Sequence, residues 1–155
     1  MNTKIKLLSL DVDGVLTDGG IYVTEKGDRF KKFNVKDGVG IREVVKKGIH
    51  VAFISAGKTK KLLDARAKML GVKFVYAGDE EKLNVMNRWC KKLKIGLDEV
   101  AHIADDINDL KLLSAVGVSA CPADSMEVVK TSVKIVLEKK GGDACVREFI
   151  DRYLL

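Results

Sequence analysis

The sequence predicts an α/β fold, a doubly wound parallel sheet in one domain over residues 1–155, and two observations support this prediction. Apolar periodicity alternates between short buried strands and helices, and such β-α-β alternation indicates a parallel sheet covered on both faces. The chain of 155 residues is long enough to bury one normal core but too short for a second domain of useful size. We therefore expect a Rossmann-like core with no insertion large enough to form a cap domain.

The expected elements follow one another in sequence order. The first buried strand is the apolar stretch 5–10, and a β-hairpin at about 20–36 comes after it. Further buried strands are expected at 49–54, 73–76, 100–104, 116–120 and 133–136. Helical spacing is found at 39–47, 59–70, 81–93, 107–115, 125–130 and 143–154. The hairpin interrupts the alternation, and we expect it to overhang the end of the first strand.

Carboxylates stand directly after the first expected strand. Asp11 and Asp13 emerge at its carboxyl edge, where open α/β sheets place their ligand crevices, and Gly14 allows the backbone to turn tightly. Two carboxylates one residue apart suit a hard cation, or a nucleophile paired with a proton donor. An Asp-rich turn after a strand is the structural alternative, and this segment alone does not decide between them.

A second acidic group follows the strand expected at 100–104. Asp105, Asp106 and Asp109 place three carboxylates within five residues, which is also typical of a solvated helix start. If this cluster shares the sheet edge of Asp11 and Asp13, the carboxylates repel one another unless a cation neutralises them. Mg²⁺ is the simplest such cation.

Two further residues stand at strand ends or helix starts on the same predicted edge. Ser55 ends the second buried strand before Ala56-Gly57-Lys58, where its hydroxyl and the free amides of a helix start can hold phosphate oxygens. An ordinary helix cap is the alternative for Ser55. Lys82 opens a helix, where the helix dipole favours anions, so it is a candidate to stabilise a phosphoryl group or an aspartate nucleophile. A surface role is the alternative for Lys82.

Charge and composition narrow the partners. The formal net charge of +6 suits nucleic acid, an anionic small substrate or a solvated lysine-rich surface. Few aromatic residues are available for base stacking, so nucleic acid is not the expected partner.

The three cysteines, Cys90, Cys121 and Cys145, lack the close spacing of a zinc or redox pair and are expected to be reduced. Neither a membrane span nor an export signal is recognised, so we expect no membrane association and a cytoplasmic location.

Together these motifs carry a resemblance to a known family. Asp-x-Asp-Gly-x-x-Thr-Asp at 11–18, Ser55, Lys82 and Asp105-Asp106-x-x-Asp109 resemble, in order and spacing, the four motifs of the haloacid dehalogenase superfamily, phosphatase branch. The similarity narrows to small capless phosphatases of sugar-acid phosphates and covers nearly the whole chain. The segments that carry it are 17–19, the hairpin, 33–42, Arg66 before Leu70-Gly71, and Gly141-Gly142 before Val146-Arg147-Glu148.

The resemblance implies roles for the motif residues. Asp11 would attack phosphorus to give an aspartyl phosphate, and Asp13 would protonate the leaving oxygen and then activate water. Mg²⁺ would be held by the Asp11 carboxylate, the Asp13 main-chain carbonyl and Asp105. Ser55 and Lys82 would hold the transferring oxygens. Asp106 would orient the site or touch substrate, and Asp109 would support the metal ligands from behind.

The resemblance also implies a substrate and an assembly. The expected substrate is 3-deoxy-D-manno-octulosonate 8-phosphate, and a nonulosonate 9-phosphate is the closest alternative. A homotetramer built through the hairpin would bring neighbouring subunits to each site. The substrate-binding positions implied are Asp13, Asn34, Asp37, Gly38, Arg42, Lys58, Arg66, Lys82 and Asp106.

The chain departs from the family pattern at two places. Ala56-Gly57-Lys58 stands where Gly-Arg is usual, so the planar bidentate contact of arginine is lost. Ala104 replaces a glycine.

Three other functions remain as alternatives. A phosphomutase would use the same aspartates but must keep its intermediate from water, and no cap is expected here. A receiver-like domain would bind magnesium without turnover, but receivers carry the phosphoacceptor on the third strand, which this order of motifs contradicts. Nucleic-acid binding is the least favoured alternative, and salt-dependent binding to DNA or RNA would be its signature.

Overall fold

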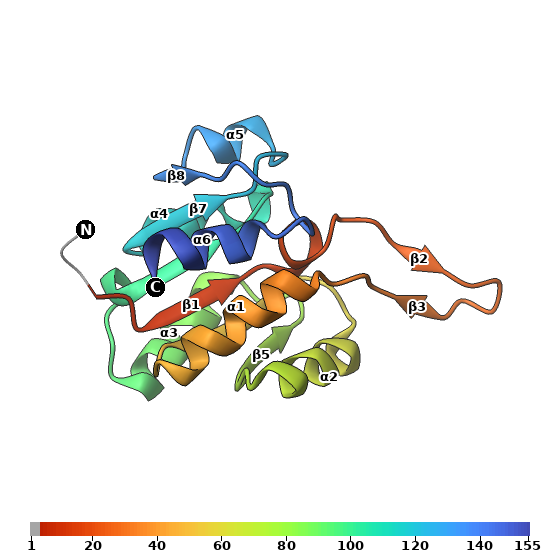
Figure 1. Ribbon diagram of the computed structural model, residues 1–155, viewed down its shortest axis with the longest axis horizontal. Coiled ribbons are helices and arrows are strands. Elements are labelled where there is room, and N and C mark those ends of the chain that lie inside the picture. The colour runs from red at the N-terminus through yellow and green to blue at the C-terminus, as the bar shows by residue number, and fades with distance from the viewer. Residues whose placement is uncertain (1–3) are drawn as a thin grey trace.

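The computed structural model describes residues 4–155, and at its centre is a six-stranded sheet with helices on both faces (Figure 1). All strand pairs of this sheet are parallel, in the order β5-β4-β1-β6-β7-β8. The strands are β1 (Leu7–Leu10), β4 (His50–Ser55), β5 (Phe74–Ala77), β6 (Val100–Ile103), β7 (Val118–Cys121) and β8 (Ile135–Val136). The predicted doubly wound parallel sheet is confirmed.

Strand β1 lies at the point where the winding of the chain reverses. From β1 the chain proceeds outward to β4 and β5, and it then returns to place β6 on the other side of β1. In open α/β sheets such a reversal leaves a crevice beyond the carboxyl ends of the strands. All four residues of β1 are buried, as expected for a central strand covered on both faces. The residues that follow β1 therefore emerge from a rigid core into this crevice.

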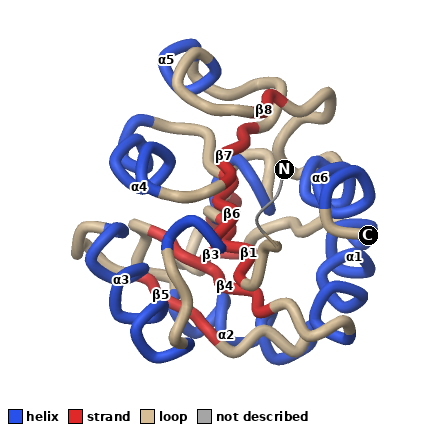
Figure 2. Tube along the Cα trace, turned by 90° about the vertical axis from the view of Figure 1, so that its left-hand side faces the viewer, coloured by secondary structure: helices blue, strands red, loops and turns tan. Residues whose placement is uncertain are grey.

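Helices cover both faces of the sheet. The helices are α1 (Val35–Lys46), α2 (Lys60–Leu70), α3 (Lys82–Leu93), α4 (Leu110–Ala115), α5 (Glu127–Lys130) and α6 (Cys145–Tyr153). Figure 2 shows α1 and α6 on one side of the sheet and α3 and α4 on the other. Ile41 of α1 and Phe149 of α6 belong to the core cluster of the first face, whereas Met86 of α3 and Leu112 of α4 belong to that of the second.

Two helix boundaries differ from the sequence-based prediction by more than two residues. Helix α1 begins at Val35 and not at residue 39, because Asn34 caps it by accepting a hydrogen bond from the Lys36 amide at 2.8 Å. The helix expected at 107–115 is a 3₁₀ turn, Ile107–Asp109, followed by α4. Periodicity does not resolve such a change, because 3₁₀ and α turns place apolar side chains similarly over one turn.

The hairpin lies where it was expected, but its strands are short. Strands β2 (Tyr22–Val23) and β3 (Arg29–Phe30) pair antiparallel and project from the end of the sheet (Figure 1). The rings of Tyr22 and Phe30 stack with their centroids 4.9 Å apart, and both residues are exposed. An isolated two-stranded hairpin has little to pack against, which keeps its regular pairing short. No cap domain is present among residues 4–155.

The cysteines agree with a further expectation. Cys90, Cys121 and Cys145 are buried and free of disulfide bonds, as small apolar residues would be. Within the described part of the chain, no helix combines the length and the apolar character that a membrane crossing requires.

Candidate active site

The turn after β1 places the first two carboxylates. The Asp11 amide donates to the carbonyl of Ile103 at 3.0 Å, which extends the pairing of β1 with β6 by one residue. The chain then turns at Gly14, whose φ of +84° lies in the left-handed region that favours glycine. A Cβ on Gly14 would lie 1.9 Å from Asp105 Oδ2, so only glycine lets the turn approach that carboxylate. The turn and the end of β6 are thereby brought into direct contact.

A pocket of about 270 Å³ opens at this edge of the sheet. Its lining residues come from the ends of β1, β4 and β6 and from the loops that follow: Asp11, Asp13, Gly19, Ser55, Ala56, Gly57, Asp105, Asp106 and Asn108. Three of the four sequence motifs thus meet in one pocket. Ser55 Oγ accepts a hydrogen bond from the Gly57 amide at 3.0 Å, which orders the loop on the pocket wall.

Lys82 lies behind this pocket and contacts the Asp11 carboxylate. Its Nζ donates to Asp11 Oδ1 at 2.8 Å and to Asp109 Oδ2 at 2.7 Å, and its side chain is only 4% exposed. Burial alone would lower the pKa of Lys82, but the charges of Asp11 and Asp109 raise it. Lys82 is therefore a buried cation shared by two carboxylates, and it orients Asp11.

The same cluster shifts the pKa values of its two carboxylates in opposite directions. Burial and the charge of Asp109 raise the pKa of Asp11, although Lys82 opposes them. Burial would also raise the pKa of Asp109, but the hydrogen bond and charge of His102, together with Lys82, hold it below its ordinary value. Asp109 thus remains an anion in the core, supported by two donors.

A cation would also stabilise the ionised form of Asp105. Burial and the charge of Asp11 raise its pKa to about 8, because two carboxylates face each other at the pocket floor. A divalent cation between them would remove this repulsion. No cluster of three or more Asp, Glu, His or Cys side chains arranged for one ion is found within residues 4–155. The set implied by the resemblance has only two carboxylates and a main-chain carbonyl, so it does not require such a cluster.

Lys31 is a site residue that the sequence reasoning missed. It follows β3 in the hairpin and forms an ion pair with Asp13 Oδ1, and its side chain is only 10% exposed. An adjoining hollow of about 130 Å³ contains Asp13, Lys31, Arg29 and Lys58, so Lys58 lies beside the pocket and not in it. The expected overhang of the hairpin was the feature of the sequence that could have pointed to Lys31. It did not identify Lys31, because the twist of the hairpin decides which of its basic side chains faces Asp13.

The remaining positions implied for substrate binding lie outside the pocket lining, around the start of α1. They are Asn34, Asp37, Gly38, Arg42 and Arg66. Arg66 lies over the Phe33 ring at 5.2 Å, donates to the carbonyl of Asn34 at 3.3 Å and would be 2.8 Å from a Cβ at Gly38. Arg42 and Arg66 lie close enough for their charges to interact, and these two residues form a basic patch.

Asp37 is the most enclosed of these residues. It is 1% exposed, and its Oδ1 accepts a hydrogen bond from the Arg147 amide at the start of α6 at 2.8 Å. Its carboxylate therefore joins α1 to α6, a contact between residues far apart in sequence.

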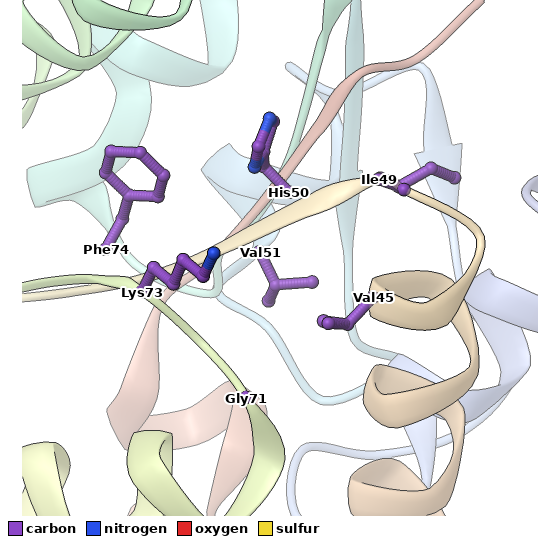
Figure 3. A pocket seen from close by; sticks show the side chains of 8 residues that line it. Val45, Ile49, His50, Val51, Gly71, Lys73 and Phe74 are labelled. Atoms are coloured by element: carbon purple, nitrogen blue, oxygen red, sulfur yellow. The ribbon is translucent and has the colours of Figure 1, made fainter.

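A second hollow lies at the opposite edge of the sheet. It encloses about 200 Å³ and is lined by Val45, Gly48, Ile49, His50, Val51, Gly71, Lys73 and Phe74 (Figure 3). This lining contains no carboxylate and no hydroxyl side chain. The carboxylates and the strand-end serine gather at the carboxyl edge, whereas this hollow offers only His50 and Lys73 as titratable side chains.

The fold and the site define a class of protein. Four features form the arrangement of haloacid dehalogenase-like hydrolases: aspartates directly after the first strand, a serine at the end of β4, a lysine at the start of α3 and an acidic cluster after β6. The family model of that description, haloacid dehalogenase-like hydrolase, matches residues 69–149, and the chain belongs to this family.

Individual relatives narrow the comparison. The chain is 40% identical over 152 residues to 3-deoxy-D-manno-octulosonate 8-phosphate phosphatase KdsC of Yersinia pestis, covering 98% of this chain and 81% of that protein. It is also 40% identical to KdsC of Escherichia coli K12, covering 98% and 80%. The crystal structure of the Moraxella catarrhalis phosphatase with magnesium, phosphate and KDO is 35% identical, with a TM-score of 0.91 and coverage of 95% and 84%.

Proposed function

We propose that this protein is a magnesium-dependent phosphatase that hydrolyses 3-deoxy-D-manno-octulosonate 8-phosphate, a precursor of lipopolysaccharide. The observation that carries the proposal is the 40% identity to KdsC over 98% of the chain. The pocket that gathers Asp11, Asp13 and Asp105 supports it independently, because these groups suit transfer of a phosphoryl group to a carboxylate.

Asp11 is the nucleophile in the proposed reaction. Its carboxylate attacks phosphorus, a bond forms between an Asp11 oxygen and phosphorus, and the bond from phosphorus to the sugar oxygen breaks. Lys82 holds Asp11 Oδ1 at 2.8 Å, which leaves the other carboxylate oxygen facing the pocket. Ser55 lines the same pocket, where its hydroxyl can contact an oxygen of the transferring group.

Asp13 is the acid and base in the proposed reaction. It gives its proton to the leaving sugar oxygen, and as a carboxylate it then takes a proton from the water that hydrolyses the aspartyl phosphate. Its side chain is 42% exposed, so substrate and water can reach it, and its ion pair is with Lys31 and not with Lys82. Asp11 is buried and oriented, which suits a nucleophile and not a proton carrier.

The donor set at the pocket floor fits a magnesium ion. The Asp11 carboxylate, the Asp13 main-chain carbonyl and Asp105 would hold it, with Asp106 and Asp109 supporting them, and the missing side chain of Gly14 keeps Asp105 against the turn. When bound, the ion would shield the anionic nucleophile from the anionic phosphate. Burial and the nearby charge of Asp11 raise the pKa of Asp105, and a bound cation would oppose both effects.

Substrate recognition and assembly complete the proposal. Lys58 beside Asp13 and the basic patch of Arg42 and Arg66 suit the carboxylate of a sugar acid. Exposed apolar side chains on the hairpin, Ile21, Val23 and Phe30, are suited to contacts between subunits of a homotetramer. In such an assembly the basic patch of Arg42 and Arg66 on one subunit would help to close the pocket of its neighbour.

The test is a panel of phosphorylated sugar acids assayed for phosphate release. We expect the highest kcat/KM for 3-deoxy-D-manno-octulosonate 8-phosphate, and loss of activity in Asp11→Asn with an unchanged circular dichroism spectrum. A higher kcat/KM for a nonulosonate 9-phosphate would move the assignment to that substrate. Absence of magnesium-dependent phosphate release from every member of the panel would overturn the proposal. Light scattering of the wild type and of Phe30→Glu tests the tetramer.

A further inference from the structure

A buried histidine at the centre of the sheet has no place in the mechanism above. His102 is a residue of β6, its exposed fraction is 0%, and it pairs in register with Ser9 of β1 and Ser119 of β7. A buried imidazole needs hydrogen-bond partners, because an unpaired polar group in the core is destabilising. His102 Nδ1 lies 3.0 Å from Ser9 Oγ, which fixes one side of the ring.

The other side of the ring is directed toward the active site. His102 Nε2 lies 2.7 Å from Asp109 Oδ1. Because the ionised Asp109 carboxylate can only accept, Nε2 carries the hydrogen of this bond. Lys82 Nζ donates to the same oxygen, Asp109 Oδ1, at 2.9 Å, and to Asp11 Oδ1 at 2.8 Å. A continuous chain of buried hydrogen bonds therefore connects His102 to Asp11.

We propose that His102 is a positioning residue for the nucleophile and acts through Asp109 and Lys82. The inference rests on the proposed phosphatase function. Lys82 can hold Asp11 in one orientation only if its own ammonium group is fixed, and Asp109 is the group that fixes it from behind. Among the described residues, two side chains donate to the Asp109 carboxylate, Lys82 and His102. His102 is therefore the group that fixes Asp109 from the core. Without the Nε2 donor, Asp109 is held only by Lys82, so no contact from the core fixes the positions of Asp109, Lys82 and Asp11.

A matched pair of substitutions separates this role from simple filling of the core. In His102→Gln, the side-chain amide nitrogen reaches the place of Nε2 and can still donate to Asp109. In His102→Asn, the amide nitrogen lies near the place of Nδ1, so it keeps the contact with Ser9 and loses the one with Asp109. Both residues are polar, and they differ by one methylene group.

We expect His102→Asn to lower kcat by about 10- to 100-fold with KM changed by less than about 3-fold, as for loss of a group that orients a catalytic residue. We expect His102→Gln to retain kcat within about 3-fold of the wild type. Thermal unfolding is measured for each variant. If His102→Asn is unfolded at the assay temperature, His102→Met, which fills the site without a donor, replaces it.

Two further variants complete the test. Ser119→Ala removes a buried hydroxyl from the strand beside His102, where it accepts from the Lys134 amide at 3.1 Å, and it should leave kcat within about 2-fold. His102→Asn should lower kcat little further in an Asp109→Asn background, because both changes break the same chain. Equal losses of kcat in the Gln and Asn variants, or additive losses with Asp109→Asn, would overturn the inference. An inactive wild type would instead overturn the proposed function.

Discussion

Replacing Asp37 by Asn should remove a pH-dependent destabilisation that is built into the contact between α1 and α6. Burial raises the pKa of Asp37 to about 6, and the Arg147 amide opposes the shift only in part. Asp37 Oδ2 has no hydrogen-bond partner within residues 4–155, which agrees with a carboxylate that is poorly compensated when charged. The quantity to measure is therefore the free energy of unfolding as a function of pH.

The sign follows from proton binding. Between the ordinary value of 3.8 and a pKa of about 6, the folded state holds a proton on Asp37 that the unfolded state has lost, so stability falls as pH rises through this window. At 1.36 kcal/mol for each pH unit, the full difference is about 3 kcal/mol. About 2 kcal/mol of it falls between pH ~4.5 and pH ~7.5.

Urea unfolding of the wild type and of Asp37→Asn over this pH range is the assay. The protein concentration is held constant, because assembly would add a concentration term. Relative to the variant, the wild type should lose about 2 kcal/mol as pH rises. Asp64→Asn, at an exposed position of α2, controls for the loss of one negative charge. A stability difference between wild type and Asp37→Asn that does not change with pH would refute the reasoning.

Three other predictions concern the pocket. Gly14→Ala should destabilise the protein by more than about 1 kcal/mol and lower activity, because the new Cβ meets Asp105 in a left-handed turn; unfolding and phosphate release measure both effects. Lys31→Ala should lower kcat by about 10-fold by releasing Asp13, whereas Lys31→Arg should retain most activity; equal kcat values would contradict this. Removal of metal with EDTA should abolish phosphate release, and added Mg²⁺ should restore it. Phosphate release that EDTA leaves unchanged would contradict the assignment of the donor set to a catalytic ion.

Much of the pocket was predictable because of how parallel sheets are built. Asp11 and Asp105 follow buried strands, and Ser55 ends one. The carboxyl ends of parallel strands lie at one edge of the sheet, and the reversal of strand order opens a crevice there. Recognising the strands was therefore enough to predict that these residues converge. The boundary of α1 was less predictable, because Asn34 extends the helix by a local capping bond that periodicity does not register.

The sequence by itself determined the class of fold, the order of its elements and the meeting of the strand-end carboxylates, since these follow from local periodicity and from strand geometry. Only the tertiary structure decided that Lys82 lies behind Asp11 with Asp109 and His102, that Lys31 faces Asp13, and that Asp37 is buried against α6. The reason is physical: the Lys82 and Asp37 contacts join residues 71 and 110 positions apart, and they depend on how helices pack on the sheet. Helical periodicity marks the apolar face of a helix, but it does not identify the distant residue that a polar side chain such as Lys82 or Asp37 contacts.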